Sequence, residues 1–239
     1  IALFAGCLLT ALGPATIVFL FAVAPHANLV VLTVLSAFFW VCSMCAVSLV
    51  WLAVPALHQS KLACILLAVV TQEVFRYGYY VVCKSAQRRL AQVTSQKLFC
   101  ADDLFGILAA GLGFGLAHAL VFFGRSLERS VGPGTIYTEA CSSMSYYMSE
   151  AILISLFTVF HMSHMVVATE SFRSMSRSRL LASGAMHVVA SGSTVFNTLP
   201  NGCLVSIPAL FLIVVATSIW ALKIVYRCMS DEVSRPVSH

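Results

Sequence analysis

Hydrophobic and polar positions along this chain form long blocks rather than the short alternations of a soluble protein. Each apolar block approaches or exceeds the ~20 residues that cross a lipid bilayer as a helix. Seven blocks cover residues 2–24, 29–56, 61–83, 104–124, 146–169, 180–198 and 203–227. Polar breaks with turn residues separate them. The pattern therefore predicts an all-α membrane protein, with seven transmembrane helices forming one domain over residues 1–239.

The composition supports a membrane protein and changes how the net positive charge is interpreted. Hydrophobic residues make up 60% of the chain and charged residues 10%, whereas about 25% of residues are charged in a typical globular protein. The formal net charge is +5, which would suggest a nucleic-acid partner in a soluble protein. Because the basic residues lie mostly between the apolar blocks, the positive-inside rule explains them better. No nucleic-acid partner is expected, and lipids are the expected surroundings.

The distribution of Lys and Arg predicts the orientation of the chain. With seven spans, ten of the 14 basic residues fall on one side of the membrane: Lys84, Arg88, Arg89, Lys97, Arg173, Arg177, Arg179, Lys223, Arg227 and Arg235. Lys61, Arg125 and Arg129 fall on the other side, and Arg76 lies within the third block. We therefore expect a cytosolic C-terminus and a lumenal or extracellular N-terminus. The first block lacks a basic leading region and is expected to remain as a helix.

An acid and a base lie inside the third apolar block. Glu73 and Arg76 are three residues apart and so share one helix face. Charges at this depth cost roughly 2.5–3.5 kcal/mol each and usually have partners. They could form a buried pair that holds neighbouring helices, or part of a proton or ion relay. A relay needs further acids, and apart from Glu150 the others fall in loops, in the tail or at span ends. The structural interpretation is favoured.

Small residues repeat every four positions along the fourth block, at Gly111, Gly115 and Ala119. Gly113 widens the smooth surface that they form. Removing side chains lets two helix backbones approach closely, which strengthens dispersion and Cα–H contacts. The repeat therefore predicts a helix interface on this block.

Two histidines, His161 and His187, lie within the fifth and sixth blocks. They could form a metal site with His164 and His118, act as a general base, or hydrogen-bond across helices, and the last interpretation is favoured. No metal, cofactor or catalytic residue is expected, since no zinc-protease, phosphate-loop or serine-hydrolase motif is present.

The cysteines suggest little redox or metal chemistry. Cys42 and Cys45 form only a weak zinc or redox pattern, because no second pair accompanies them. Packing within the membrane is the favoured interpretation for most of the cysteines. Cys141 and Cys203 fall near the same predicted membrane face, where they could form a disulfide.

The third block carries the closest resemblance to a known family. The segment from Gln72 to Arg76, followed by Tyr79 and Tyr80, resembles the Aph-1 family, the seven-span scaffold subunit of gamma-secretase. Further matches are Gly13-Pro14-Ala15, Ala37-Phe38-Phe39-Trp40, Gly111-Leu112-Gly113-Phe114-Gly115, Gly132-Pro133-Gly134, His161 and His187. Ala119 stands where the family has its third glycine, and His118 beside it departs from the family pattern.

The resemblance implies a non-catalytic role in an intramembrane protease complex. A presenilin-like subunit would supply both catalytic aspartates, with nicastrin-like and Pen-2-like subunits as further partners. Such complexes cleave single-span proteins, Notch among them, in the endoplasmic reticulum, Golgi, endosomal and plasma membranes. Gly111, Gly115 and Ala119 would support assembly, and His161 and His187 would stabilise the helices near presenilin.

Two other functions are consistent with the residues. One is a transporter or receptor with a polar cavity around Glu73, His161 and His187. The other is a self-sufficient intramembrane hydrolase that depends on His187.

Overall fold

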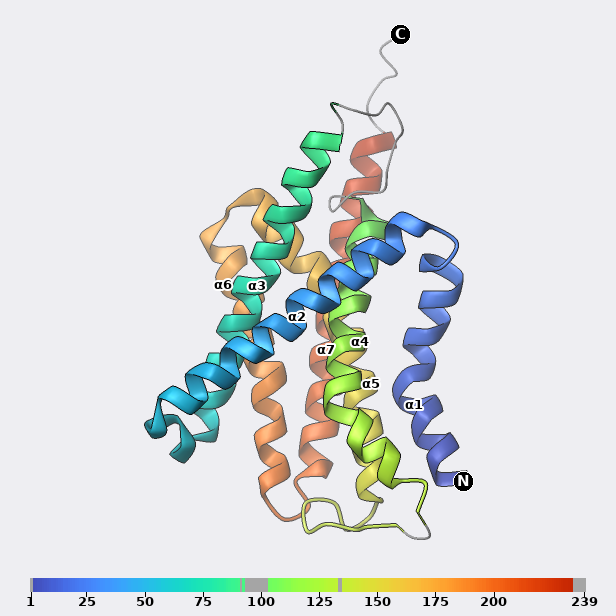
Figure 1. Ribbon diagram of the computed structural model, residues 1–239, viewed down its shortest axis with the longest axis vertical. Helices are drawn as coiled ribbons and strands as arrows, with labels where there is room; N and C mark the ends of the chain where they lie inside the picture. Colours follow the sequence, from blue (N-terminus) through green and yellow to red (C-terminus); the bar gives the residue numbers. More distant parts are fainter. Residues whose placement is uncertain (1, 91, 93–102, 133–134, 234–239) are drawn as a thin grey trace.

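The computed structural model describes residues 2–90, 92, 103–132 and 135–233, with the backbone alone described at position 125 and positions 231–233. This part of the chain is helical and carries no strand, which confirms the expected all-α class (Figure 1). The elements are α1 (Ala2–Val18), η1 (Phe19–Val23), α2 (Ala27–Ala53), η2 (Pro55–Gln59), α3 (Lys61–Leu90), α4 (Leu104–Arg129), α5 (Tyr146–Ser174), α6 (Arg177–Ser193), η3 (Thr194–Thr198) and α7 (Cys203–Val233).

Six of these helical segments are long and apolar enough to cross a membrane: Ala2–Val23, Ala27–Ala53, Lys61–Leu90, Leu104–Gly124, Tyr146–Ser174 and Cys203–Ser230. The predicted sixth span corresponds to α6, which has 17 residues and a length of about 26 Å, somewhat less than the ~30 Å hydrocarbon core. The 3₁₀ segment η3 continues it by about 10 Å. The count of seven spans and the orientation remain predictions.

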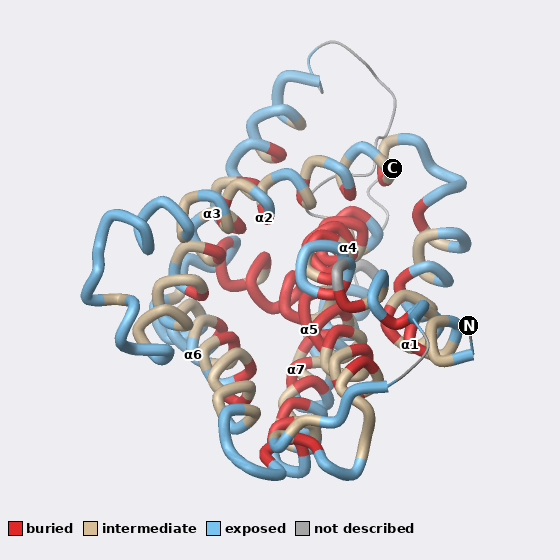
Figure 2. The backbone as a smooth tube through the Cα atoms, turned by 60° about the horizontal axis from the view of Figure 1, so that its bottom comes forward, coloured by how far each residue is buried: buried red, intermediate tan, exposed pale blue. Residues whose placement is uncertain are grey.

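Helices α4 and α5 form the centre of the bundle. In their most apolar windows 61% of residues are buried, against 22–28% in the other four candidate spans. Figure 2 shows this concentration of buried positions along both helices. Helix α2 crosses α4 obliquely, α1 lies on the opposite flank from α3 and α6, and α7 packs along α5 (Figure 1). The peripheral helices therefore present apolar faces on the outside of the bundle.

A disulfide closes one end of the bundle. Cys141, in the connection between α4 and α5, bonds Cys203 at the start of α7, so the pairing that the sequence left open is present. Two backbone hydrogen bonds support it, from Cys203 N to Ala140 O at 2.9 Å and from Asn201 N to Glu139 O at 2.7 Å. Disulfides persist in oxidising compartments. The connection between α4 and α5, which carries Cys141, lies at the same end of the bundle as the N-terminus (Figure 1).

Some residues used in the sequence predictions lie outside the described part. These are Lys97 and Arg235, which entered the orientation, and Pro133 and Gly134 of the expected turn after α4.

Candidate functional site

Glu73 and Arg76 form an ion pair on the face of α3 that meets α5 and α6. Arg76 Nε lies 3.3 Å from Glu73 Oε1, and the Arg76 side chain is 0% exposed while that of Glu73 is 20% exposed. The guanidinium carbon lies 4.5 Å from the centre of the Phe114 ring on α4, a cation–π distance. Arg76 Nη2 lies 3.4 Å from His161 Nδ1 on α5. The buried cation therefore has an anion, a ring face and a hydrogen-bond acceptor around it.

Two more histidines bind the same carboxylate oxygen. His164 Nε2 on α5 lies 3.0 Å from Glu73 Oε1, and His187 Nδ1 on α6 lies 2.6 Å from it. We call Glu73, Arg76, His161, His164 and His187 the polar cluster. Because its members come from α3, α5 and α6, the cluster ties three helices together by hydrogen bonds that lipid cannot replace.

The partners of each ring assign its tautomer. A guanidinium can only donate, so His161 accepts at Nδ1 from Arg76 and carries its proton on Nε2. The Glu73 carboxylate only accepts, so His187 donates from Nδ1 and His164 from Nε2. The Glu73 carboxylate and the Arg76 guanidinium pair one negative with one positive charge. This balance suits a site within a membrane, where an uncompensated charge is costly.

The glycines of α4 lie where its backbone touches two other helices. A Cβ built on Gly111 would lie 2.6 Å from Met162 Cα, and one on Gly115 would lie 3.1 Å from Thr158 Cα, both on α5. A Cβ on Gly113 would overlap Ser36 Oγ and Thr33 O of α2. Contacts this close leave no room for a side chain, so these three positions require glycine in this packing.

Ala119 extends this surface toward α1. It is buried and packs in one cluster with Cys7 and Ala11 of α1 and with Ala151 and Ile154 of α5. The predicted stripe of Gly111, Gly115 and Ala119 thus lies along the side of α4 that faces α5, with α1 joining at its end.

Comparison with known proteins identifies the family. The sequence model of the family described as Aph-1 protein matches residues 2–228. The chain belongs to the Aph-1 family. It is 31% identical to "Gamma-secretase subunit Aph-1b" of Danio rerio over 92% of this chain and 88% of the relative. It is 28% identical to "Gamma-secretase subunit APH1-like" of Arabidopsis thaliana, over 95% and 94% of the two chains. Identity to human "Gamma-secretase subunit APH-1B" is 25%, over 92% and 87%.

The structure shows where the two histidines of this Aph-1 protein form their hydrogen bonds. His161 and His187 have ring centres 5.8 Å apart in an edge-to-face arrangement. Each forms a hydrogen bond across helices to α3, His161 to Arg76 and His187 to Glu73, so the ion pair lies between them. His164 is a central member of the polar cluster, although the sequence suggested it only as a further ligand of a possible metal site. Its spacing of three residues from His161 places both on one face of α5 and was the available signal.

His118 lies beside the polar cluster. Its ring centre is 5.3 Å from that of His161 and 5.0 Å from that of Phe157. Its ring centre also lies 5.8 Å from that of Trp40 on α2. His118 therefore helps to fill the space between α2, α4 and α5 as an aromatic ring.

Glu73, His164 and His187 also have the composition of a metal site. One donor atom from each lies within 4.8 Å of the others, and three protein ligands are typical of a zinc centre with an open position. However, Glu73 Oε1 already accepts from both rings and lies 3.3 Å from the guanidinium nitrogen. A divalent ion on that oxygen would stand close to a full positive charge in a low-dielectric interior. We therefore interpret the polar cluster as a hydrogen-bonded connection between helices.

This interpretation predicts that added zinc leaves stability unchanged. The thermal unfolding midpoint of the purified protein in detergent should be the same with Zn²⁺ and with a chelator, because the Glu73 oxygen already accepts hydrogen bonds from His164 and His187. A ligand that binds the folded state raises the midpoint with concentration. A saturable increase with Zn²⁺, lost in His164→Ala, would contradict the interpretation.

Proposed function

We propose that this Aph-1 protein is a non-catalytic assembly subunit of a gamma-secretase complex. In this proposal it binds a nicastrin-like subunit, stabilises a presenilin-like catalytic subunit and carries a Pen-2-like subunit in the same assembly. The names of its relatives as gamma-secretase subunits support the proposal. The main support for a non-catalytic role is the polar cluster. Its charged groups and imidazole rings bond one another across three helices, so they hold the helices together.

The residue types in the spans support a non-catalytic role. An intramembrane aspartyl protease needs two aspartates within the membrane, and none of the six candidate spans delimited by the described residues contains one. Glu73 is the only acid near the middle of a span, and its Oε1 is held by three basic groups. This chain therefore depends on a partner for such catalysis.

The polar cluster gives less support to a transporter or receptor. A binding cavity would need Glu73, His161 and His187 to present groups to a ligand, whereas they bond other members of the cluster. His161 and His187 are also buried. A relay of protons or ions would need further acids along a path, and none accompanies Glu73 in α3.

The orientation and location of the protein follow from the same proposal. The N-terminus and the Cys141–Cys203 disulfide would face the lumen or the cell exterior, where a nicastrin-like ectodomain also lies. The parts of α3 and α7 that carry Arg88, Arg89, Lys223 and Arg227 would face the cytosol. The protein would reside in the endoplasmic reticulum, Golgi, endosomal and plasma membranes with its complex.

Affinity purification of the tagged protein in a mild detergent tests the proposal. Mass spectrometry of the bound fraction should identify presenilin-like, nicastrin-like and Pen-2-like chains. The purified complex should cleave a single-span substrate, and the chain purified alone should not, because the spans lack the required aspartates. Cleavage by the chain alone, or a bound fraction without gamma-secretase subunits, would refute the proposal.

A further inference from the structure

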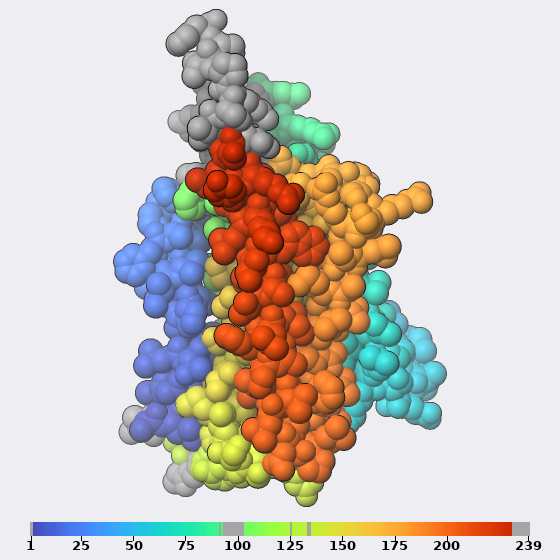
Figure 3. All heavy atoms as spheres, turned by 180° about the vertical axis from the view of Figure 1, so that it is seen from behind, coloured from blue at the N-terminus to red at the C-terminus, as the bar shows by residue number. Residues whose placement is uncertain are grey.

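An apolar stripe runs along the outer face of α7. Its large exposed side chains are spaced three, four and seven residues apart and therefore share one helix face; they are Leu212, Val215, Ile219 and Leu222. Ile219 is 49% exposed and Leu222 is 66% exposed. Figure 3 shows α7 along the front of the molecule, with this helix open over most of its length.

The stripe ends at two cations and a tyrosine. Lys223 and Arg227 are four residues apart, one turn of the helix, and both are exposed. Together with Tyr226, Ile219 and Leu222 they line a shallow groove of 360 Å³. Neither cation forms an ion pair with an acid among the residues whose side chains the structure describes. The groove therefore combines an apolar floor with unpaired positive charge at one end.

The spacing along α7 matches the dimensions of the membrane's hydrocarbon core. From Cys203, where the helix begins, to Lys223 the rise is about 30 Å, the thickness of the hydrocarbon core. Lys223 therefore falls at the edge of the core. Tyr226 and Arg227 lie about 5 Å farther, at the level of the headgroups, where tyrosine is enriched. From Leu212 to Leu222 the rise is about 15 Å, the depth of half the core.

We propose that this groove binds one anionic phospholipid of the cytosolic leaflet. Its acyl chain lies along Ile219 and Leu222, and its phosphate lies between Lys223 and Arg227. A guanidinium can bind a phosphate through two N–H groups, and an ammonium adds a second positive charge. A lipid phosphodiester carries one negative charge, so the carboxylate of a headgroup such as phosphatidylserine adds a second anionic group for the second cation, whereas the choline of phosphatidylcholine adds only a positive charge. The inference does not depend on membership of a protease complex, because the groove belongs to α7 alone.

Lipid binding to the purified full chain tests this site. Native mass spectrometry would measure binding of phosphatidylserine and of phosphatidylcholine with the same acyl chains. Phosphatidylserine should bind more tightly, and Lys223→Gln with Arg227→Gln should weaken it about 25-fold, about fivefold for each charge removed near the surface. Phosphatidylcholine binding should weaken less, because its choline cation offsets its phosphate and it relies mainly on the apolar floor.

A matched control carries Lys61→Gln and Arg177→Gln, two exposed cations on other helices. It removes the same net charge and should keep the preference for phosphatidylserine. Glycerophosphoserine, which has the headgroup but no acyl chains, should not displace the lipid. Unfolding midpoints would show that all variants are folded.

Three outcomes would overturn the proposal. The first is equal loss of phosphatidylserine binding in the control. The second is displacement by glycerophosphoserine, which would assign the site to a free anion. The third is unchanged lipid preference in the Lys223 and Arg227 variant with loss of co-purified subunits, which would assign the groove to a protein partner.

Discussion

Replacing Glu73 with glutamine should destabilise the helix bundle by about 3–5 kcal/mol, the cost of leaving a buried charge without its partner. Arg76 is 0% exposed and lies 3.3 Å from the carboxylate. In the variant its positive charge would face only a ring and neutral acceptors. His164 and His187 would also lose the charged acceptor that both share, and such hydrogen bonds are stronger than neutral ones.

The double variant Glu73→Gln with Arg76→Met should recover much of this loss. Methionine is unbranched and similar in length to the aliphatic part of arginine, and it removes the uncompensated charge. Replacing a buried ion pair by apolar groups is often nearly neutral, whereas removing one partner is not. Equilibrium unfolding of the purified protein in micelles would give the free energies of the single and double variants and their coupling.

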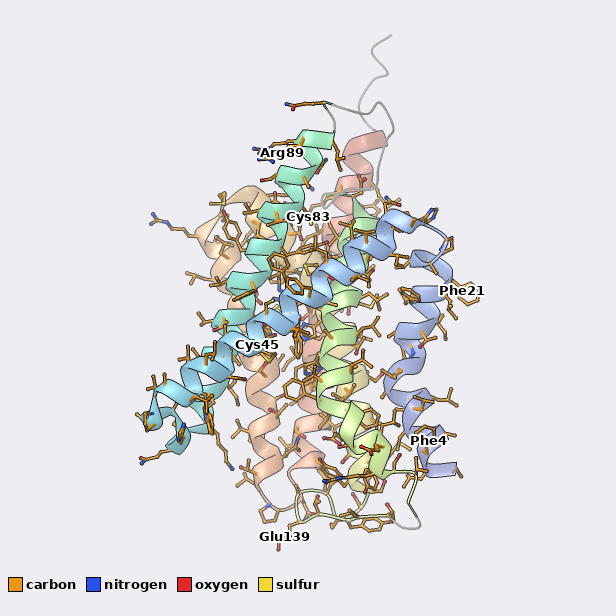
Figure 4. All side chains as sticks on the ribbon, in the orientation of Figure 1. Phe4, Phe21, Cys45, Cys83, Arg89 and Glu139 are labelled. Atoms are coloured by element: carbon orange, nitrogen blue, oxygen red, sulfur yellow. A yellow bond between two sulfur atoms is a disulfide. The ribbon has the colours of Figure 1, made fainter. Side chains whose placement is uncertain are left out.

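Glu139→Gln serves as the control for the loss of a carboxylate. Glu139 is exposed in the connection between α4 and α5, where its side chain points away from the bundle (Figure 4). This variant should unfold at the same midpoint as the unmodified protein. If the double variant lost the sum of the two single effects, Glu73 and Arg76 would contribute independently, and the polar cluster would not be a compensated pair.

The long apolar blocks located the helices, because a helix that crosses a membrane needs an unbroken apolar stretch. They were less accurate at the helix ends, since a helix continues beyond the membrane while hydropathy does not. Helix α3 extends to Leu90 and α7 to Val233, past the predicted limits at 83 and 227. Arg88 and Arg89 lie in the last turn of α3, where a positive charge interacts favourably with the negative end of the helix dipole.

The site was only partly predictable, because contacts within one helix can be read from spacing and contacts between helices cannot. The spacing of Glu73 and Arg76 predicted their pairing, and the structure places them in contact. The bonds of Glu73 to His164 and His187 depend on how α3 lies against α5 and α6. Likewise, sequence placed Gly113 beside the α4 stripe, but only the packing shows that it faces α2 instead of α5.

Replacing Gly111 with leucine should abolish assembly of the complex while leaving membrane insertion intact. Even the first carbon of the new side chain would lie 2.6 Å from Met162 Cα, and a backbone atom cannot rotate away. The two central helices must therefore separate, and overpacking of this kind typically costs 1–3 kcal/mol or more. Insertion should be unaffected because leucine favours the bilayer.

Gly124→Leu is the matched control, since it lies on the same helix and a Cβ there meets nothing within 4 Å.

Gly113→Leu should be as harmful as Gly111→Leu, because it would meet the Thr33 carbonyl of α2. Gly115→Leu should also reduce assembly but less strongly, since a Cβ there lies 3.1 Å from the Thr158 backbone, compared with 2.6 Å from the Met162 backbone at Gly111. Quantifying co-purified nicastrin-like and presenilin-like subunits, relative to inserted protein, would test this order. Equal recovery with Gly111→Leu and Gly124→Leu would show that assembly does not require the close approach of α4 and α5.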